Sequence, residues 1–215
     1  MIKSFCKANN LNIIGKILVF DKSDKREVEA CIAISKITNK SETLSKEINL
    51  IVLENNIPII VGMCRIAKVK RKNTGVEDWP LDDEAYKSGD DFLWTYMLRN
   101  LSVECPNDRQ TPSKKYSGLG FILYKIAVEL SYISGCNGRL ITLSRVNISH
   151  KFHLDFGFKD YDFKTFPGGI PTFQAMYLPY EIIEKIKKQP MLDSSINFDL
   201  KFSPGLFSTK VQSFM

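Results

Sequence analysis

The sequence predicts an α/β protein with a mixed, mostly antiparallel central sheet flanked by helices. Three observations support this fold class. Two apolar runs separated by a pair of asparagines are typical of a hairpin, a glycine-broken loop leads into a helix with an apolar stripe, and short strands and helices follow in turn. We expect a single domain over residues 1–215, with a core over about residues 12–188 and a tail of uncertain structure over 189–215.

The first part of the chain is expected to contain a strand and two helices. Asn12–Phe20 is a short β-branched run between polar neighbours, which predicts a strand. Ser23 or Asp24 is positioned to cap a helix that runs to about Ile37, although the alternation of apolar residues there fits a strand nearly as well. A second, short helix is expected over Ser41–Lys46.

The middle of the chain predicts a hairpin. Ile48–Glu54 and Pro58–Val69 are apolar runs, and Asn55 and Asn56 between them tolerate the left-handed conformation of a tight turn. An acidic loop without apolar periodicity is expected next, from Lys70 to Asp91, and a loop of this length is usually functional or disordered.

Two roles are open for the carboxylates of this loop. They attract a cationic substrate through their combined field, or they form a solvated surface. The acidic residues are Glu77, Asp78, Asp82, Asp83, Glu84, Asp90 and Asp91.

The second half of the chain alternates strands and helices. A strand is expected over Phe92–Val103, and Gly118 then opens a helix whose end is bracketed by Gly135 and Gly138. The apolar residues of this helix repeat at helical spacing: Ile122, Leu123, Ile126, Ala127, Leu130 and Ile133. The elements expected after it are a strand over Arg139–Val146, a helix over Ser149–Phe156 that stops at Gly157, paired strands at Tyr161–Phe163 and Thr172–Leu178, and a helix over Pro179–Lys188.

The loop K-Y-S-G-L-G at Lys115–Gly120 is a candidate phosphate site. Gly118 and Gly120 let the backbone approach a ligand, and the first turn of the helix adds N–H groups and the positive end of its dipole. A glycine pair before a helix also occurs where the helix simply packs tightly, so this fragment alone leaves both interpretations open.

Composition limits the class of protein. The net charge of +6 comes mainly from scattered lysines, which favours an anionic cofactor over nucleic acid as the partner. The five cysteines are odd in number and form no C-x-x-C pair, which argues against a disulfide framework or a zinc site. The longest apolar run, Ile57–Cys64, is too short to span a bilayer. We therefore expect a cytoplasmic protein that does not bind membranes.

The order of these motifs resembles that of the GCN5-related N-acetyltransferase (GNAT) superfamily over roughly Ile48–Leu178. The hairpin L-E-N-N-I-P-I-I-V-G-M is similar to the second and third strands of the family, with Gly62 at the usual glycine, and L-R-N-L-S-V is similar to the fourth strand. K-Y-S-G-L-G resembles the acetyl-CoA signature R/Q-x-x-G-x-G/A, and S-H-K-F-H-L-D-F-G-F resembles A-x-x-L-Y-x-x-x-G-F.

The resemblance implies an acetyl-CoA-dependent N-acetyltransferase that transfers the acetyl group directly to a primary amine, of a small molecule or of a protein. The amine acceptor is unidentified, and a monomer or homodimer is expected. The pantetheine arm would lie between Leu98–Val103 and Arg139–Val146, where free N–H groups near Leu101 would hold the thioester oxygen. The residues implied for cofactor binding are Leu101, Val103, Lys115, Tyr116, Ser117, Gly118, Leu119, Gly120 and Asn147.

The catalytic residues are where the sequence departs from the family. His153 stands at the usual tyrosine acid, and it is either that acid or a polar residue on the last helical turn before Gly157. The tyrosines that could replace it as the acid are Tyr116, Tyr161 and Tyr177. The candidate base is Glu104, with Asp91 or ordered water as alternatives. Lys115 replaces the first Arg or Gln of the signature, so it keeps the positive charge without the planar donors.

Two other functions remain open. An acyltransferase like the homoserine-lactone synthases would share the length and the long loop before the fourth strand, but the phosphate-type loop argues against it. A catalytically idle acyl-CoA-binding regulatory module would explain the missing tyrosine and the missing strand glutamate.

Overall fold

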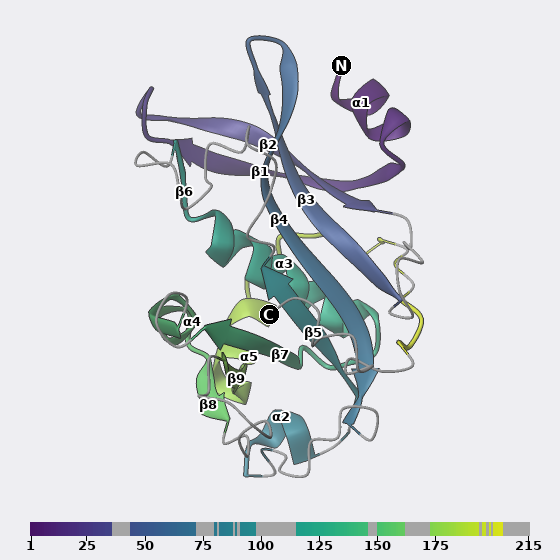
Figure 1. Ribbon diagram of the computed structural model, residues 1–215, viewed down its shortest axis with the longest axis vertical. Helices are drawn as coiled ribbons and strands as arrows, with labels where there is room; N and C mark the ends of the chain where they lie inside the picture. The colour runs from purple at the N-terminus through teal and green to yellow at the C-terminus, as the bar shows by residue number, and fades with distance from the viewer. Residues whose placement is uncertain are drawn as a thin grey trace.

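The computed structural model describes residues 1–35, 44–71, 80, 82–87, 89, 91–97, 115–145, 150–161, 173–193, 195–196, 198 and 200–203. Within them, a nine-stranded sheet has the order β6-β1-β2-β3-β4-β5-β7-β9-β8, with helices packed against it (Figure 1). The expected fold class, a mixed and mostly antiparallel sheet flanked by helices, is confirmed.

The helices are α1 (Ile2–Ala8), α2 (Glu84–Lys87), α3 (Leu119–Ile133), α4 (His150–Phe156) and α5 (Tyr180–Lys187). The strands are β1 (Leu11–Asp21), β2 (Arg26–Ser35), β3 (Ser45–Glu54), β4 (Ile57–Lys70), β5 (Asp91–Met97), β6 (Tyr116–Ser117), β7 (Leu140–Arg145), β8 (Lys159–Tyr161) and β9 (Phe173–Tyr177).

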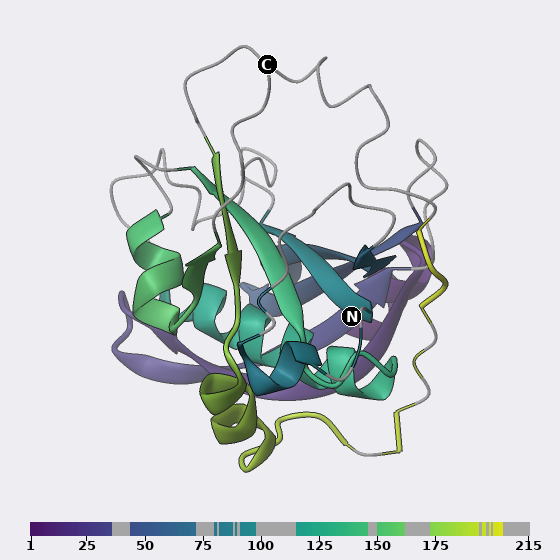
Figure 2. The ribbon, with the colours of Figure 1, turned by 90° about the horizontal axis from the view of Figure 1, so that it is seen from below.

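One pair of neighbouring strands is parallel. β5 and β7 run in the same direction, with Leu93 opposite Leu140 and Thr95 opposite Thr142, whereas the other named strand pairs are antiparallel. Parallel neighbours need a crossover connection, and α3 lies in the connection between these two strands. Figure 2 shows the two strands, seen from below, with α3 across one face of the sheet.

The helix expected from Ser23 or Asp24 is wrong, because β2 occupies that segment and pairs antiparallel with β1 and β3. Residues 30–35 of β2 are all buried, since α3 and its core cover one face of the strand and α1 covers the other. A strand buried on both faces loses the clean alternation that marks a half-exposed strand. Ser45 and Lys46 likewise belong to β3, and residues 41–43 of the short helix expected there lie outside the described residues.

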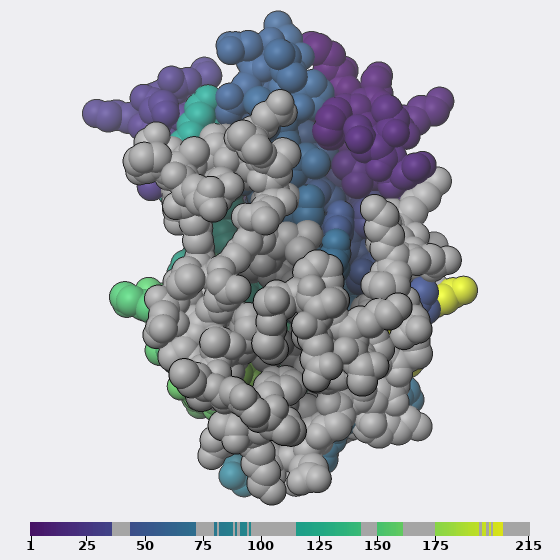
Figure 3. Space-filling view, viewed as in Figure 1, coloured from purple at the N-terminus to yellow at the C-terminus, as the bar shows by residue number. Residues whose placement is uncertain are grey.

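Three elements were not expected from the sequence: α1, β6, and α2, which lies within the segment expected to be an acidic loop. α1 packs on the second face of the sheet, where Cys6 meets Cys31, Ala33 and Ile51 in a small apolar cluster. β6 is only two residues long and pairs with the end of β1, at Phe20 and Asp21. In the space-filling view, α1 and the tip of the β3–β4 hairpin stand out at one end of the molecule (Figure 3).

The predicted hairpin is confirmed. β3 and β4 pair from Glu54 opposite Ile57 to Ser45 opposite Ala67, and the two turn residues have positive φ angles, 48° at Asn55 and 64° at Asn56. Asparagine reaches this left-handed region more readily than most residues, and two such residues in succession form the turn that matches the twist of a hairpin.

The central helix and the elements after it also match their predicted positions. α3 ends in a Schellman motif: Gly135 has φ 80°, its N–H donates to the Tyr132 carbonyl at 3.0 Å, and the Cys136 N–H donates to the Ser131 carbonyl at 2.8 Å. The structure also confirms β7, α4, the β8·β9 pair and α5. β5 accounts for residues 91–97 of the expected strand, and its continuation to Val103 lies outside the described residues.

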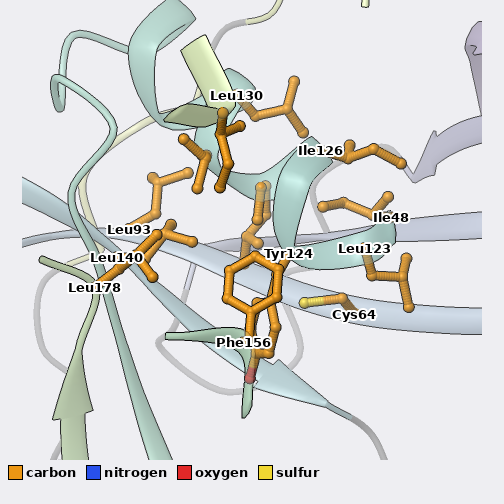
Figure 4. Packing of buried hydrophobic residues seen from close by; sticks show 14 of the residues in the cluster. Ile48, Cys64, Leu93, Leu123, Tyr124, Ile126, Leu130, Leu140, Phe156 and Leu178 are labelled. Atoms are coloured by element: carbon orange, nitrogen blue, oxygen red, sulfur yellow. The ribbon is translucent and has the colours of Figure 1, made fainter. Parts of the chain in front are cut away.

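The main core lies between α3 and the sheet. Leu123, Tyr124, Ile126 and Leu130 project from α3 toward the strands, and Leu140 of β7 lies among them (Figure 4). The C-terminal segment completes this core with Leu192, Phe198 and Leu200, all buried. The burial of an apolar stripe, at roughly 25 cal/mol per Å² removed from water, stabilises α3 more than its intrinsic helix propensity does.

Candidate functional site

The loop Lys115–Gly120, called the glycine turn below, lies at the N-terminal end of α3. Gly118 precedes the helix with φ 74° and ψ 1°, and the Ile122 N–H donates to its carbonyl at 3.0 Å. The N–H groups of the first helical turn, at Leu119, Gly120 and Phe121, are those that an α-helix leaves without intrahelical acceptors. A Cβ added at Gly118 would meet no heavy atom within 4 Å, so an anion has room to approach this backbone.

The turn lies at the carboxyl ends of the parallel strands. Because α3 is in the connection from β5 to β7, its first turn lies on the side where both strands end, and α4 lies on the same side (Figure 1). Ligands of open α/β sheets bind outside the carboxyl ends of parallel strands, at a helix N-terminus. The glycine turn therefore occupies the place where a phosphate site is expected.

Gly120 has a different role from Gly118. A Cβ at Gly120 would come within 2.5 Å of the Phe152 ring, so the missing side chain lets α4 pack against α3. The Phe121 ring also meets the Phe152 ring edge-on, with centroids 5.4 Å apart. The two motifs of the sequence, K-Y-S-G-L-G and F-H-L-D-F-G-F, are thus in contact in the fold.

The Lys115 ammonium is paired with two carboxylates, Asp21 at the end of β1 and Glu54 at the end of β3. Its Nζ lies 3.1 Å from Glu54 Oε1 and 3.6 Å from Asp21 Oδ2, and the Tyr116 hydroxyl donates to the same Glu54 oxygen at 2.6 Å. Burial lowers the pKa of Lys115, but the hydrogen bond to Glu54 and the nearby carboxylates raise it above its ordinary value. Burial and Glu54 also raise the pKa of the Tyr116 hydroxyl. Lys115 therefore anchors the turn, and a phosphate would have to compete for its charge.

A polar cleft adjoins this anchor. β2 pairs with β3 over Cys31–Ile34 and Ile48–Ile51, and beyond this pairing a small open cleft of about 100 Å³ lies between the β1–β2 turn and the β3–β4 turn. Its walls carry three carboxylates and two cations, and Arg26 pairs with Asp24 at 3.1 Å. The lining residues are Asp21, Asp24, Arg26, Val28, Leu53, Glu54, Asn55, Lys115 and Tyr116.

His153 is buried and belongs to a chain of polar groups. Its Nδ1 lies 2.9 Å from the Tyr124 hydroxyl, which lies 3.4 Å from Oγ1 of Thr142. The Thr142 hydroxyl donates to the Thr95 carbonyl at 3.0 Å. This chain of polar groups runs from α4 through α3 to the parallel strands, where Thr95 lies opposite Thr142.

Aromatic rings surround this chain. The Tyr124 ring lies 4.9 Å from the Phe158 ring and 5.9 Å from the Phe152 ring, centroid to centroid, and His153 lies 5.8 Å from Phe158. The polar chain is therefore enclosed by apolar side chains, where hydrogen bonds are stronger than in water.

Tyr124, Thr142 and Thr95 were not singled out from the sequence. The signal for Tyr124 was present, because it is a residue with a hydroxyl inside the apolar stripe of α3, and a buried tyrosine oxygen needs a partner. The two threonines carry no comparable signal, since threonine is common in strands for its shape alone.

Some of the predicted site residues lie outside the described residues. These are Leu101, Val103, Glu104 and Asn147. The structure brings together Lys115, Tyr116, Ser117, Gly118, Leu119 and Gly120 at the start of α3, and His153 packs beneath the same helix. Of the alternative tyrosines, Tyr116 is bonded to Glu54, and Tyr177 packs edge-on against Tyr86 with centroids 5.4 Å apart.

Part of the acidic loop has a structural role. Asp83 Oδ1 accepts the Ala85 N–H of α2 at 3.0 Å, and both Asp83 oxygens lie 3.1 Å from the Tyr180 nitrogen at the start of α5. Glu84 pairs with Lys87 at 3.2 Å. The idea that this loop attracts a cationic substrate stays a prediction, and within residues 82–84 it falls on Asp82 and Glu84, which are both exposed.

The described residues contain neither a metal-binding cluster nor a helix able to cross a membrane. No group of three or more His, Cys, Asp or Glu side chains in this part of the chain is placed to hold a metal ion. No helix among the described ranges has both the length and the apolar character needed to cross a membrane.

Comparison with known proteins assigns no family. No protein-family model matches the chain, and no curated protein matches it. A crystal structure of an uncharacterized protein from Bacillus halodurans is similar with a TM-score of 0.44 and 11% sequence identity, over 82% of this chain and 96% of that one. At this level the similarity identifies neither a shared fold nor a function.

Proposed function

We propose that this chain is an acetyl-CoA-dependent N-acetyltransferase with a GNAT-like fold that transfers the acetyl group directly to a primary amine. The observation that carries the proposal is the open glycine turn at Gly118, at the head of the helix that connects two adjacent parallel strands. An anionic group held there, at the carboxyl ends of β5 and β7, matches the pyrophosphate of coenzyme A in charge and in the donors it needs.

The arrangement of elements supports the same assignment. The resemblance expects a hairpin, then a fourth strand, then a fifth strand beside the fourth. The sheet has β3 and β4 followed by β5 and then β7 in neighbouring positions. The contact of Phe152 with Gly120 also joins the two motifs on which the resemblance rests.

The reaction would take place beside the parallel strands. The acceptor nitrogen attacks the thioester carbonyl carbon, an N–C bond forms, and the C–S bond breaks with its electron pair going to sulfur. The N–H groups of the glycine turn hold the cofactor, His153 acts as the donor toward the leaving sulfur, and Glu104 or water takes the proton of the amine. Coenzyme A supplies the activated acetyl group when it is bound.

A second candidate, an idle acyl-CoA-binding module, is favoured by two observations. His153 is only 3% exposed, and the charge of Lys115 is already balanced by Glu54 and Asp21. Such a module would use the glycine turn in the same way and would release no thiol.

Thermal unfolding with acetyl-CoA tests the binding step that both candidates share. Bound ligand at one hundred times its Kd stabilises a protein by about 2.7 kcal/mol, so a clear rise in Tm is expected. The test variant is Gly118→Asn, because asparagine tolerates positive φ and places a side chain in the open space beside the turn.

Gly135→Asn is the matched control, because Gly135 has nearly the same φ angle, 80°, at the opposite end of the same helix. We expect the Tm rise with acetyl-CoA in the wild type and in Gly135→Asn, and a loss of the rise in Gly118→Asn. No rise in the wild type would contradict both candidates, and equal rises in the two variants would remove the turn as the site.

Release of free thiol from acetyl-CoA in the presence of a panel of primary amines separates the enzyme from the idle module. Amine-dependent release above the rate of the heat-denatured protein supports the transferase. Binding without release would identify the module.

A further inference from the structure

We infer that Glu54 is an autoinhibitory residue: its carboxylate holds the Lys115 ammonium in the free protein and must release it before that charge can neutralise an anion at the glycine turn. The inference rests on the proposed function, because it concerns the affinity of the same turn for the pyrophosphate of coenzyme A. It adds a residue from a distant strand, β3, to the control of that site.

The place of Lys115 in the chain lets its ammonium serve either partner. Lys115 is the first residue of the glycine turn and precedes Gly118 by three positions, so the two Cα atoms are at most about 11 Å apart. Its side chain is a flexible four-carbon stem that ends in a compact charge. In the structure Nζ lies over the Tyr116 ring, 5.5 Å from the centroid, at the cleft between the β1–β2 turn and the β3–β4 turn. Figure 1 shows β6, which carries Tyr116, beside the end of β1.

The ammonium is outnumbered by carboxylates where it lies. Its Nζ is 3.1 Å from Oε1 of Glu54 and 3.6 Å from Oδ2 of Asp21, so one positive charge faces two negative charges. Asp24 and Arg26, which also line the cleft, pair with each other at 3.1 Å and add no net charge. The walls of the cleft therefore carry an excess of one negative charge, which opposes an incoming anion.

The two carboxylates differ in how firmly they are fixed. The Asp21 side chain is 3% exposed, and its Oδ1 accepts two backbone N–H groups of the β1–β2 turn, at 2.9 and 3.3 Å, which commits it to that turn. The Glu54 side chain is 21% exposed, and its Oε1 also accepts the Tyr116 hydroxyl at 2.6 Å. Glu54 therefore keeps a donor and contact with water when Lys115 leaves, so it is the partner that a phosphate can replace.

Glu54→Gln tests the inference, with Glu47→Gln as the matched control. Glutamine keeps an oxygen that can accept the Tyr116 hydroxyl and removes the charge. Glu47 lies on the same strand, its side chain is 22% exposed, and its Oε1 pairs with Arg65 at 2.7 Å. It is seven residues from Glu54, about 23 Å along the strand, which is more than two Debye lengths at physiological ionic strength.

Isothermal titration calorimetry of the full-length proteins measures the affinities, with acetyl-CoA and inorganic pyrophosphate as separate ligands. We expect Glu54→Gln to lower the Kd of both ligands by about twofold to fivefold, the range that a partly exposed ion pair accounts for. Glu47→Gln should leave both Kd values unchanged. An unchanged or raised Kd in Glu54→Gln, or an equal fall in Glu47→Gln, would overturn the inference.

A second comparison separates exchange of the ammonium from simple repulsion. The charge of Glu54 repels an anion with or without Lys115, whereas competition for the ammonium requires Lys115. We therefore expect Glu54→Gln to lower the Kd by a smaller factor in the Lys115→Gln background than in the wild type. Equal factors in the two backgrounds would identify repulsion alone and would contradict the exchange.

The two ligands separate this inference from the proposed function. A lower Kd for pyrophosphate in Glu54→Gln, in a protein that does not bind acetyl-CoA, would support the exchange and contradict the function. Acetyl-CoA binding that is equally tight in Glu54→Gln and in the wild type would contradict the exchange and leave the function standing. If neither ligand binds the wild type or the variant, both are wrong.

Discussion

The two glycines of the turn differ in what surrounds them. Gly118 needs its freedom of backbone conformation, because its φ is 74° and a Cβ there would meet open space. Gly120 needs the absence of a side chain, because the Phe152 ring occupies the position of its Cβ. One glycine is thus available to a ligand, whereas the other joins two helices.

Gly120→Ala tests this distinction through the sign of the stability change. In a helix without a clash, replacing Gly by Ala stabilises by up to about 1 kcal/mol. Here the new Cβ would lie 2.5 Å from the Phe152 ring. We therefore expect destabilisation by about 1–3 kcal/mol, measured by urea unfolding.

Phe152→Leu provides the second half of this test. With the ring removed, Gly120→Ala should become neutral or stabilising when it is introduced into the Phe152→Leu background. If Gly120→Ala instead stabilises the wild type, the close packing of α3 and α4 is not the reason for this glycine.

At the scale of elements, Asp83 connects two helices that are distant in the sequence. Its carboxylate accepts the Ala85 N–H of α2 and the Tyr180 N–H of α5. We expect Asp83→Ala to lower the free energy of unfolding by about 1–2 kcal/mol, as the loss of a helix cap does. Chemical denaturation is the measurement, and Asp82→Ala, an exposed neighbour, is the control with almost no change expected.

The same residues give a cleaner test of the acidic loop. Asp82→Asn together with Glu84→Gln removes two exposed charges and leaves the cap at Asp83 intact. If the field of the loop attracts a cationic acceptor, this double variant raises the acceptor KM at low ionic strength and the difference shrinks in high salt. An unchanged acceptor KM would contradict that role.

At the scale of the whole molecule, Glu129 holds the C-terminal segment on α3. Its two carboxylate oxygens accept the Met191 N–H at 2.8 Å and the Leu192 N–H at 2.7 Å. Further along, the Ser203 N–H donates to the Lys68 carbonyl at 2.8 Å, and Lys68 and Lys70 lie over the Phe202 ring. The described residues of the segment 189–215, which reach Ser203, are therefore part of the fold.

Glu129 predicts a pH dependence of stability. Burial raises its pKa above the ordinary value of 4.5, and the two N–H bonds oppose this shift without cancelling it. The folded state thus binds the proton more tightly than the unfolded chain does, so the contribution of Glu129 is fully present below pH 4.5 and is lost as the pH rises through the raised pKa.

The measurement compares the wild type with Glu129→Gln, whose side chain does not titrate. The free energy of unfolding of the wild type minus that of Glu129→Gln should fall as the pH rises from about 4 to about 8. A difference that stays constant or rises over this range would contradict the raised pKa.

Local chemistry made several parts of the structure predictable. The apolar spacing along α3 and the glycine at the C-terminal end of α3 depend on residues that are close together in the chain. The same is true of the Asn55–Asn56 turn. The sequence also pointed to the glycine turn at Gly118, because the conformational freedom of glycine is a local property. The segment of β2 was wrongly predicted as a helix. The elements that bury its two faces, α3 and α1, are distant in sequence, so local residues do not reveal that both faces are buried.

The fold class, the central helix and the position of the candidate phosphate turn could therefore be predicted from the sequence. The contacts of the side chains around that turn became known only from the folded structure. It pairs Lys115 with Asp21 and Glu54, places the Phe152 ring where a side chain at Gly120 would be, and joins His153 to Tyr124. The physical reason is that charge pairing and ring packing depend on distances between residues that only the folded chain brings together.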